Sequence, residues 1–137
     1  MYRFTMYLLV LACLAAPVRA RPKSQPVDRD YLSALNVANR FLNAWQNQDQ
    51  ETAILLLTDR LREPSQEDRL QALFSAPTGS RSAYELCRGR KLAAGRYEFP
   101  IVLFRVSESS PKWQHPHTAT LIIVRSGKDE WLLDKLP

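Results

Sequence analysis

The sequence predicts an α+β fold: three N-terminal helices packed on a four-stranded antiparallel sheet. Up to about Ser80, apolar residues recur at the three- and four-residue spacing of helices, and beyond it they alternate with the period of strands. The joins between the predicted strands are of hairpin length. A run of helices followed by a run of strands with short joins favours an antiparallel sheet with the helices on one face.

The first predicted helix is the longest. It begins behind Asp28, a suitable N-cap, and ends near Asn47-Gln48, whose side chains compete with the backbone for hydrogen bonds. Its apolar stripe contains Tyr31, Ala34, Leu35, Ala38, Phe41, Leu42 and Trp45.

Two shorter helices are expected to follow. The second is capped by Asp49 and stops near Thr58-Asp59. The third is announced by Ser65 with Asp68 three residues on, an Asp variant of the capping box. Its apolar face consists of Leu70, Leu73 and Phe74.

Four strands are predicted after the break at residues 77–80. They lie around Ala83–Cys87, Tyr97–Val106, Trp113–Arg125 and Glu130–Leu136. Turns are expected at Gly89–Lys91 or Ala94-Gly95, and at Ser126–Asp129.

Pro100 falls inside the second predicted strand. Proline has no N–H to donate to a neighbouring strand, so it is confined to edges and bulges of a sheet. The sequence therefore predicts an exposed edge or a bulge in the Tyr97–Phe104 stretch.

The N-terminus has the pattern of a secretory signal. Arg3 precedes the apolar run Phe4–Ala16, and Val18 and Ala20 are small residues at the −3 and −1 positions of a cleavage site after Ala20. Met1–Ala20 is thus predicted to be a signal peptide. The run is shorter than the roughly 20 apolar residues of a membrane span, which favours cleavage over an uncleaved anchor.

The same segment leaves one alternative open, because Val10-Leu11-Ala12-Cys13 partly matches a bacterial lipoprotein signal. Leu11 is bulkier than the residue usual there, which favours an ordinary signal. Residues 21–27 contain two prolines without periodicity and are interpreted as a disordered lead. A single domain over residues 28–137, in a secreted or periplasmic protein, is the expectation.

Composition narrows the function classes. The net charge is +5, and acids are interleaved with the basic residues, which is typical of a solvated surface and predicts no nucleic-acid partner. The densest basic cluster is Arg88, Arg90, Lys91 and Arg96. Cys87 is the one cysteine beyond the signal, so no internal disulfide is expected, and it is interpreted as a small buried residue.

Two stretches resemble a known superfamily. Ala38–Leu61 (ANRFLNAWQNQDQETAILLLTDRL) is similar to the opening of the nuclear-transport-factor-2-like, or cystatin-like, superfamily, in which a long helix ends in a polar pair plus Asp. Leu121–Leu136 (LIIVRSGKDEWLLDKL) resembles its terminal hairpin. The resemblance implies a cone-shaped α+β domain in which a curved sheet wraps around the long helix to form a pocket.

The resemblance also implies a range of functions, since members include isomerases, dehydratases and ligand-binding domains. The enzymes use a carboxylate or a His–Asp pair reaching into the cone. The strand acids Glu85, Glu98 and Asp134 are each flanked by apolar residues, which indicates outward-facing positions, and none has a histidine at a recognisable offset. No catalytic residue is therefore assigned.

The candidate binding residues are aromatic. An apolar pocket is predicted to be lined by Trp45, Tyr84, Phe104, Trp113 and Trp131. His115 and His117 alternate in an extended segment and are weak candidates for metal ligands, but two ligands do not make a site, so no metal or cofactor is expected.

The expected function is that of an exported, non-catalytic domain that binds a protein partner or a small apolar ligand. Two alternatives stay open: a small-molecule lyase or isomerase of the cone-shaped type, and the extracytoplasmic part of a membrane-anchored assembly. A homodimer is possible. Membrane association is expected only if the signal is uncleaved or Cys13 is lipidated.

Overall fold

A computed structural model of the chain describes residues 26–77, 79–106 and 116–137. The predicted signal, its predicted cleavage site, and the residues Trp113 and His115 lie outside these ranges. The described elements, in chain order, are α1 (Arg29–Gln46), α2 (Gln50–Leu55), α3 (Asp59–Arg62), a 3-10 turn η1 (Pro64–Gln66), α4 (Glu67–Phe74), β1 (Arg81–Leu86), β2 (Arg90–Ala93), β3 (Arg96–Val106), β4 (His117–Arg125) and β5 (Trp131–Lys135).

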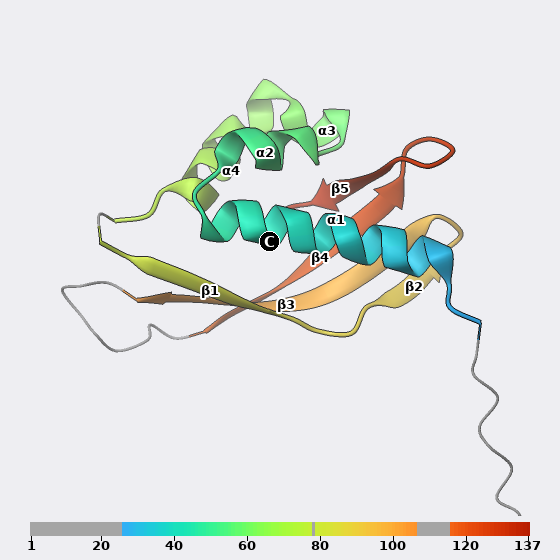
Figure 1. The fold of residues 1–137 in the computed structure, drawn as a ribbon. Helices are drawn as coiled ribbons and strands as arrows, with labels where there is room; N and C mark the ends of the chain where they lie inside the picture. The colour runs from blue at the N-terminus through green and yellow to red at the C-terminus, as the bar shows by residue number, and fades with distance from the viewer. Residues whose placement is uncertain (1–25, 78, 107–115) are drawn as a thin grey trace, which may run out of the picture.

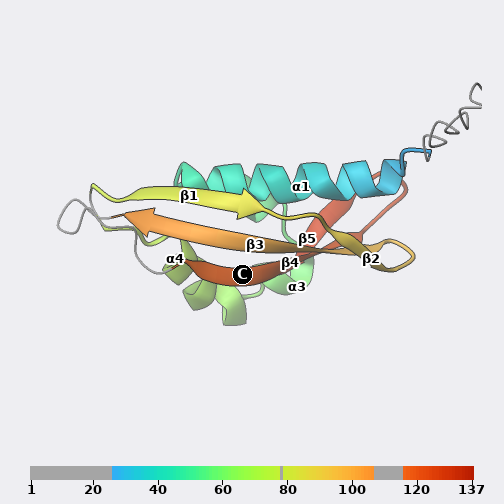
Figure 2. The same cartoon turned by 90° about the horizontal axis from the view of Figure 1, so that it is seen from below.

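The architecture is α+β with an antiparallel sheet, as the sequence predicts. The strands follow the order β1-β3-β4-β5, and β2 also pairs with β3. Figure 1 shows α1 lying along one face of the sheet, with the shorter helices on the same side. Figure 2 shows the strands from below, with β3 between β1 and β4. No helix of the described chain is long and apolar enough to cross a membrane.

The described residues contain four α-helices and five strands, so the prediction of three and four is wrong in detail. The extra helix, α3, exists because α2 stops at Leu55 and the chain then pairs with β5. The Thr58 N–H donates to the Leu133 carbonyl at 2.9 Å, and the Leu133 N–H donates to the Leu56 carbonyl at 2.7 Å. This pairing pulls residues 56–58 out of the helix before α3 begins.

The extra strand is β2, in a stretch where one of the two alternative turns was expected. Lys91 pairs with Tyr97 and Arg90 with Glu98. The turn lies instead at the second expected position, Ala94-Gly95, where Gly95 has φ +68°. Glycine adopts this left-handed conformation without steric cost, which closes the β2–β3 hairpin there.

Two of the three predicted helix caps are confirmed. Asp28 accepts from the Asp30 N–H and Asp49 from the Thr52 N–H, both at 3.0 Å. The Ser65 cap is wrong, because η1 contains Ser65 and α4 has no side-chain cap. Pro64 at the start of η1 has the backbone angle that a helical turn requires, so the turn begins before Ser65.

The predicted edge at Pro100 is also wrong. β3 is a central strand, and its pairing with β4 runs through Pro100 and Thr120 without a register shift. The opposite side of Pro100 faces the interval between β1 and β2, where the Cys87 N–H donates to the Pro100 carbonyl at 2.9 Å. The missing N–H of Pro100 therefore faces the gap between β1 and β2, where no strand carbonyl needs a donor. A proline at this central position thus costs the sheet little stability.

The core fills the space between α1 and the inner face of the sheet. Phe41 and Leu42 of α1, Phe99 of β3 and Leu133 of β5 are fully buried. Alternate residues of a strand lie on the same face, so the inner face of β3 runs through buried residues at every second position and then reaches Arg105. The buried members of that series are Tyr97, Phe99, Ile101 and Leu103.

A candidate ligand pocket

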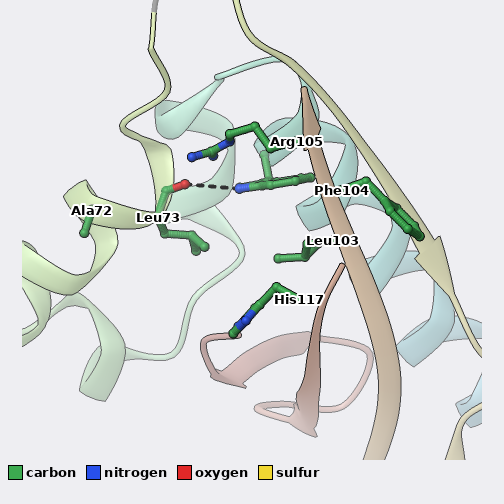
Figure 3. A pocket seen from close by; sticks show the side chains of 7 residues that line it. Ala72, Leu73, Leu103, Phe104, Arg105 and His117 are labelled. Atoms are coloured by element: carbon green, nitrogen blue, oxygen red, sulfur yellow. Dashed lines mark hydrogen bonds between the residues drawn. The ribbon is translucent and has the colours of Figure 1, made fainter. Parts of the chain in front are cut away.

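A pocket of about 240 Å³ opens where the end of α1, α4 and the ends of β3 and β4 meet. Figure 3 shows it from close by. Its lining consists of Trp45, Ala72, Leu73, Leu103, Phe104, Arg105 and His117.

Trp45 forms the floor of this pocket and ties two helices together. It lies in the last turn of α1, 3% exposed, and its indole Nε1–H donates to the Leu73 carbonyl at 3.1 Å. Leu73 is in the last turn of α4, where helix carbonyls lack a partner within the helix. The hydrogen bond therefore fixes α4 over the end of α1 and sets the width of the pocket.

Arg105 continues the inner face of β3 beyond Leu103. Its guanidinium carbon lies 5.7 Å from the centre of the Trp45 ring, and its Nη1–H donates to the Ser75 carbonyl at 3.2 Å. The Nε atom is buried and has no hydrogen-bond partner within residues 26–77, 79–106 and 116–137. Trp45 and Arg105 thus both bind carbonyls at the C-terminal end of α4, where a cation is favourable.

His117 begins β4 and pairs in register with Leu103. The two residues therefore share the inner face, and Figure 3 shows both side chains beside the pocket. His117 is exposed. The walls of the pocket are mainly apolar, the basic side chains of Arg105 and His117 lie beside them, and the described lining holds no carboxylate.

The predicted aromatic residues do not line one pocket. Trp45 and Phe104 belong to the lining, but Phe104 alternates with Leu103 and Arg105, and its ring points away from them in Figure 3. Tyr84 donates its hydroxyl to Asn43 at 3.3 Å. Trp131 lies at the far end of the sheet, where its ring is 5.7 Å from that of Tyr97. Trp113 is outside the described residues.

The sequence interpretation missed the contribution of Ala72, Leu73, Leu103 and above all Arg105. A signal for Arg105 was present, because it extends an apolar series of period two that begins at Tyr97. A charge at the end of such a series lies on the core face of the strand. The role of α4 had no comparable signal, since its approach to Trp45 depends on tertiary packing.

The histidine pair is only half within the described residues. His117 lines the pocket, and His115 falls outside the described ranges. Over the described residues, no three side chains of His, Cys, Asp or Glu lie close enough to hold a metal ion.

The strand acids lie away from the pocket. Glu85 is exposed, and Glu98 forms an ion pair with Arg90. Asp134 accepts from the Thr58 hydroxyl at 3.1 Å and pairs with Arg60 at 3.1 Å. It also lies 3.6 Å from the Arg96 guanidinium, so its contacts join α3, β3 and β5.

These contacts also engage most of the basic cluster. Arg90 and Arg96 are paired with Glu98 and Asp134, and the Lys91 amine lies 6.0 Å from the centre of the Tyr97 ring. Cys87 is a free, partly buried thiol. It directly follows β1, where its N–H donates to the Pro100 carbonyl.

Solved structures with the same fold share little sequence with this chain. A ketosteroid isomerase-like protein from Erwinia carotovora atroseptica superimposes with a TM-score of 0.58 at 13% identity, covering 78% of this chain and 92% of that one. A domain of unknown function with a cystatin-like fold from Nostoc punctiforme superimposes with a TM-score of 0.58 at 13% identity and covers 81% of each chain.

A third structure is a putative calcium/calmodulin-dependent protein kinase type II association domain from Thiobacillus denitrificans. It gives a TM-score of 0.57 at 12% identity and covers 71% of this chain and 86% of that one. No protein-family model and no curated protein matches the sequence. The likeness shows a cystatin-like fold, which confirms the fold that the sequence resemblance implies. At this identity it carries no function.

Proposed function

We propose that this protein is an exported, non-catalytic binding domain that holds a small molecule with an apolar body in the pocket beside Trp45. The observation that carries the proposal is the composition of the pocket. Trp45, Leu73 and Leu103 supply apolar walls, and a few polar groups converge on one side, which is the usual make-up of small-molecule sites. The export part of the proposal rests on the signal pattern of Met1–Ala20 alone.

An isomerase is the second candidate, because one structural neighbour is named ketosteroid isomerase-like. Proton abstraction next to a carbonyl needs a base with a suitable pKa directed into the cavity. The described lining offers no carboxylate, and its one side chain able to accept a proton is His117. This composition supports binding over catalysis.

The proposal is tested by screening a library of small aromatic and aliphatic compounds against the purified domain. The indole N–H signal of Trp45 in a ¹⁵N-resolved NMR spectrum serves as reporter, because that N–H lies in the pocket floor. We expect some compounds to shift it in a saturable way. The variant Ala72→Trp fills the pocket and should abolish the shifts, whereas Gln71→Trp, an exposed neighbour on α4 outside the lining, should preserve them.

Two results would contradict the proposal. One is a library in which no compound shifts the Trp45 signal, and the other is binding that survives Ala72→Trp unchanged. Compounds that bind should also be incubated with the protein and recovered. Conversion of a bound carbonyl compound that is lost in His117→Ala would favour the isomerase instead.

A further inference from the structure

We propose that the ligand is a small carboxylate whose acid group binds Arg105 and whose apolar body packs against Trp45 and Leu103. This inference rests on the proposed function and specifies its ligand class. Three features of Arg105 carry it: its burial, the partners it lacks, and its position at the pocket.

Arg105 differs in environment from the other described arginines. It is partly buried, and every other arginine in the described ranges is exposed. Five of those exposed arginines form ion pairs with Asp or Glu, yet no acid of the described chain pairs with Arg105: the paired set is Arg60, Arg62, Arg90, Arg96 and Arg125. Withdrawing a cation from water without an anion is unfavourable. Several exposed arginines also lack an ion pair, but water solvates them, so the missing acid matters most at Arg105, which is partly buried.

The hydrogen bonds of Arg105 are also incomplete. A guanidinium has five N–H donors, and within the described part of the chain its one hydrogen bond runs from Nη1 to the Ser75 carbonyl. Nε is buried and finds no acceptor among the described residues. The guanidinium carbon lies over the Trp45 ring, 5.7 Å from its centre, within the range of a cation–π interaction. A carboxylate accepts from two N–H groups of such a plane at once, and the geometry of both groups matches.

Part of the position of Arg105 has a structural explanation, because it caps the C-terminal end of α4. That role explains why Nη1 donates to the Ser75 carbonyl and why a positive charge is favourable beside the end of this helix. It does not supply a negative charge. A test must therefore separate loss of an anion contact from loss of the cap.

The pocket also limits the ligand. Its volume of about 240 Å³ is below the range of roughly 300–1,000 Å³ that is usual for drug-sized ligands. This points to a body about the size of one aromatic ring. His117 lies beside the pocket on the neighbouring strand, where its imidazole can offer a second N–H to the carboxylate.

The experiment compares phenylacetate with phenylacetamide, its uncharged analogue of nearly the same shape, by titration on the Trp45 indole signal. We expect phenylacetate to bind the natural sequence at least tenfold more tightly than the amide. Arg105→Met should remove this preference while the amide still binds measurably, which shows that the pocket still forms. Arg81→Met is the matched control: Arg81 is exposed on the neighbouring strand β1 and outside the lining, so the preference should persist.

The outcomes separate the two proposals. Equal binding of acid and amide overturns the carboxylate inference and leaves the binding function intact. An equal loss of preference in Arg105→Met and Arg81→Met also overturns it, because the effect is then general charge attraction.

If Arg105→Met no longer binds the amide either, the variant Arg105→Lys decides. Lysine keeps the positive charge but lacks the planar guanidinium, so a weaker preference for the acid with amide binding retained supports the inference. If Arg105→Lys also loses the amide, or keeps the full preference, the inference is wrong. If neither compound nor any other ring-sized molecule binds, both proposals fail.

Discussion

Gly89 occupies a position that admits no side chain. A Cβ built there would lie 2.4 Å from two ring carbons of Phe99 and 2.8 Å from the Glu98 carbonyl oxygen. Phe99 is fully buried, and its ring lies 5.6 Å from that of Tyr31, whose hydroxyl accepts from the Gly89 N–H at 3.3 Å. An added Cβ would therefore have to displace a buried ring and the backbone of β3.

We therefore predict that Gly89→Ala lowers the free energy of unfolding by about 1–3 kcal/mol, the usual cost of overpacking a filled core. Urea denaturation followed by circular dichroism measures it. Gly127→Ala is the control, because a Cβ there meets Glu130 at an ordinary 3.7 Å, and it should change stability by less than about 0.5 kcal/mol. Equal stability of the two variants would contradict the prediction and show that the chain between β1 and β2 can shift to admit a side chain.

From the sequence, Gly89 is predicted only to be part of a turn. Its actual constraint comes from Phe99, which the chain brings back across the gap between the two short strands. Local patterns indicate where a chain bends, but the contact that forbids a side chain depends on the register of β1 and β2 against β3. Residue-level constraints of this kind need the fold.

At the scale of elements, one hydrogen bond joins the start of α1 to the sheet. The Tyr97 hydroxyl donates to the Asp28 carboxylate at 2.7 Å. This bond lowers the pKa of Asp28 from its ordinary value of 3.8, and burial together with Asp28 raises the pKa of Tyr97 to about 12. Asp28 is also the N-cap of α1, so a single carboxylate fixes where the helix begins and where it lies on β3.

We predict that the stability advantage of the natural sequence over Tyr97→Phe is largest between about pH 5 and 9. Asp28 contributes stability that is present above its ordinary pKa and is lost as the pH falls through the lowered folded value. Tyr97 contributes stability that is present below 10 and is lost as the pH rises from 10 towards about 12, because the unfolded chain ionises first. Urea midpoints of both proteins across this range measure the difference. An advantage that is constant with pH would mean that the bond does not form in solution.

Element boundaries show what the sequence could and could not predict. The helix caps at Asp28 and Asp49 and the turn at Ala94-Gly95 depend on local chemistry, and all three agree with the structure. The early end of α2 and the central place of Pro100 depend on neighbours distant in sequence: Leu133 for the former, and the break after Leu86 for the latter. The number of elements was therefore wrong while the fold class was right.

At the scale of the molecule, the fold class follows from the order and period of the elements, and the candidate pocket follows from it only in part. The resemblance implies a pocket inside the cone, and Trp45 lies there. The other aromatic candidates were chosen by residue type, which says nothing about the face of a strand, so Trp131 falls at the opposite end of the sheet. Arg105 lies on the core face of its strand, as the alternation indicates, but it was not considered because the expected site was apolar.

Export is the last property of the whole chain that the sequence predicts, and it can be tested directly. We predict that the full chain, expressed in a bacterium with a periplasm, is recovered there with an intact mass that begins at Arg21. The small side chain of Ala20 fits the peptidase at the last position before the cut, so Ala20→Trp should block processing and retain the chain at the membrane. Cys13→Ser is the control and should be processed normally.

A natural chain that begins at Cys13 with added lipid mass would establish a lipoprotein, and a full-length mass would establish an anchor. In either case the pocket would act at the membrane surface, which would favour a role within an anchored assembly over that of a freely diffusing binding protein.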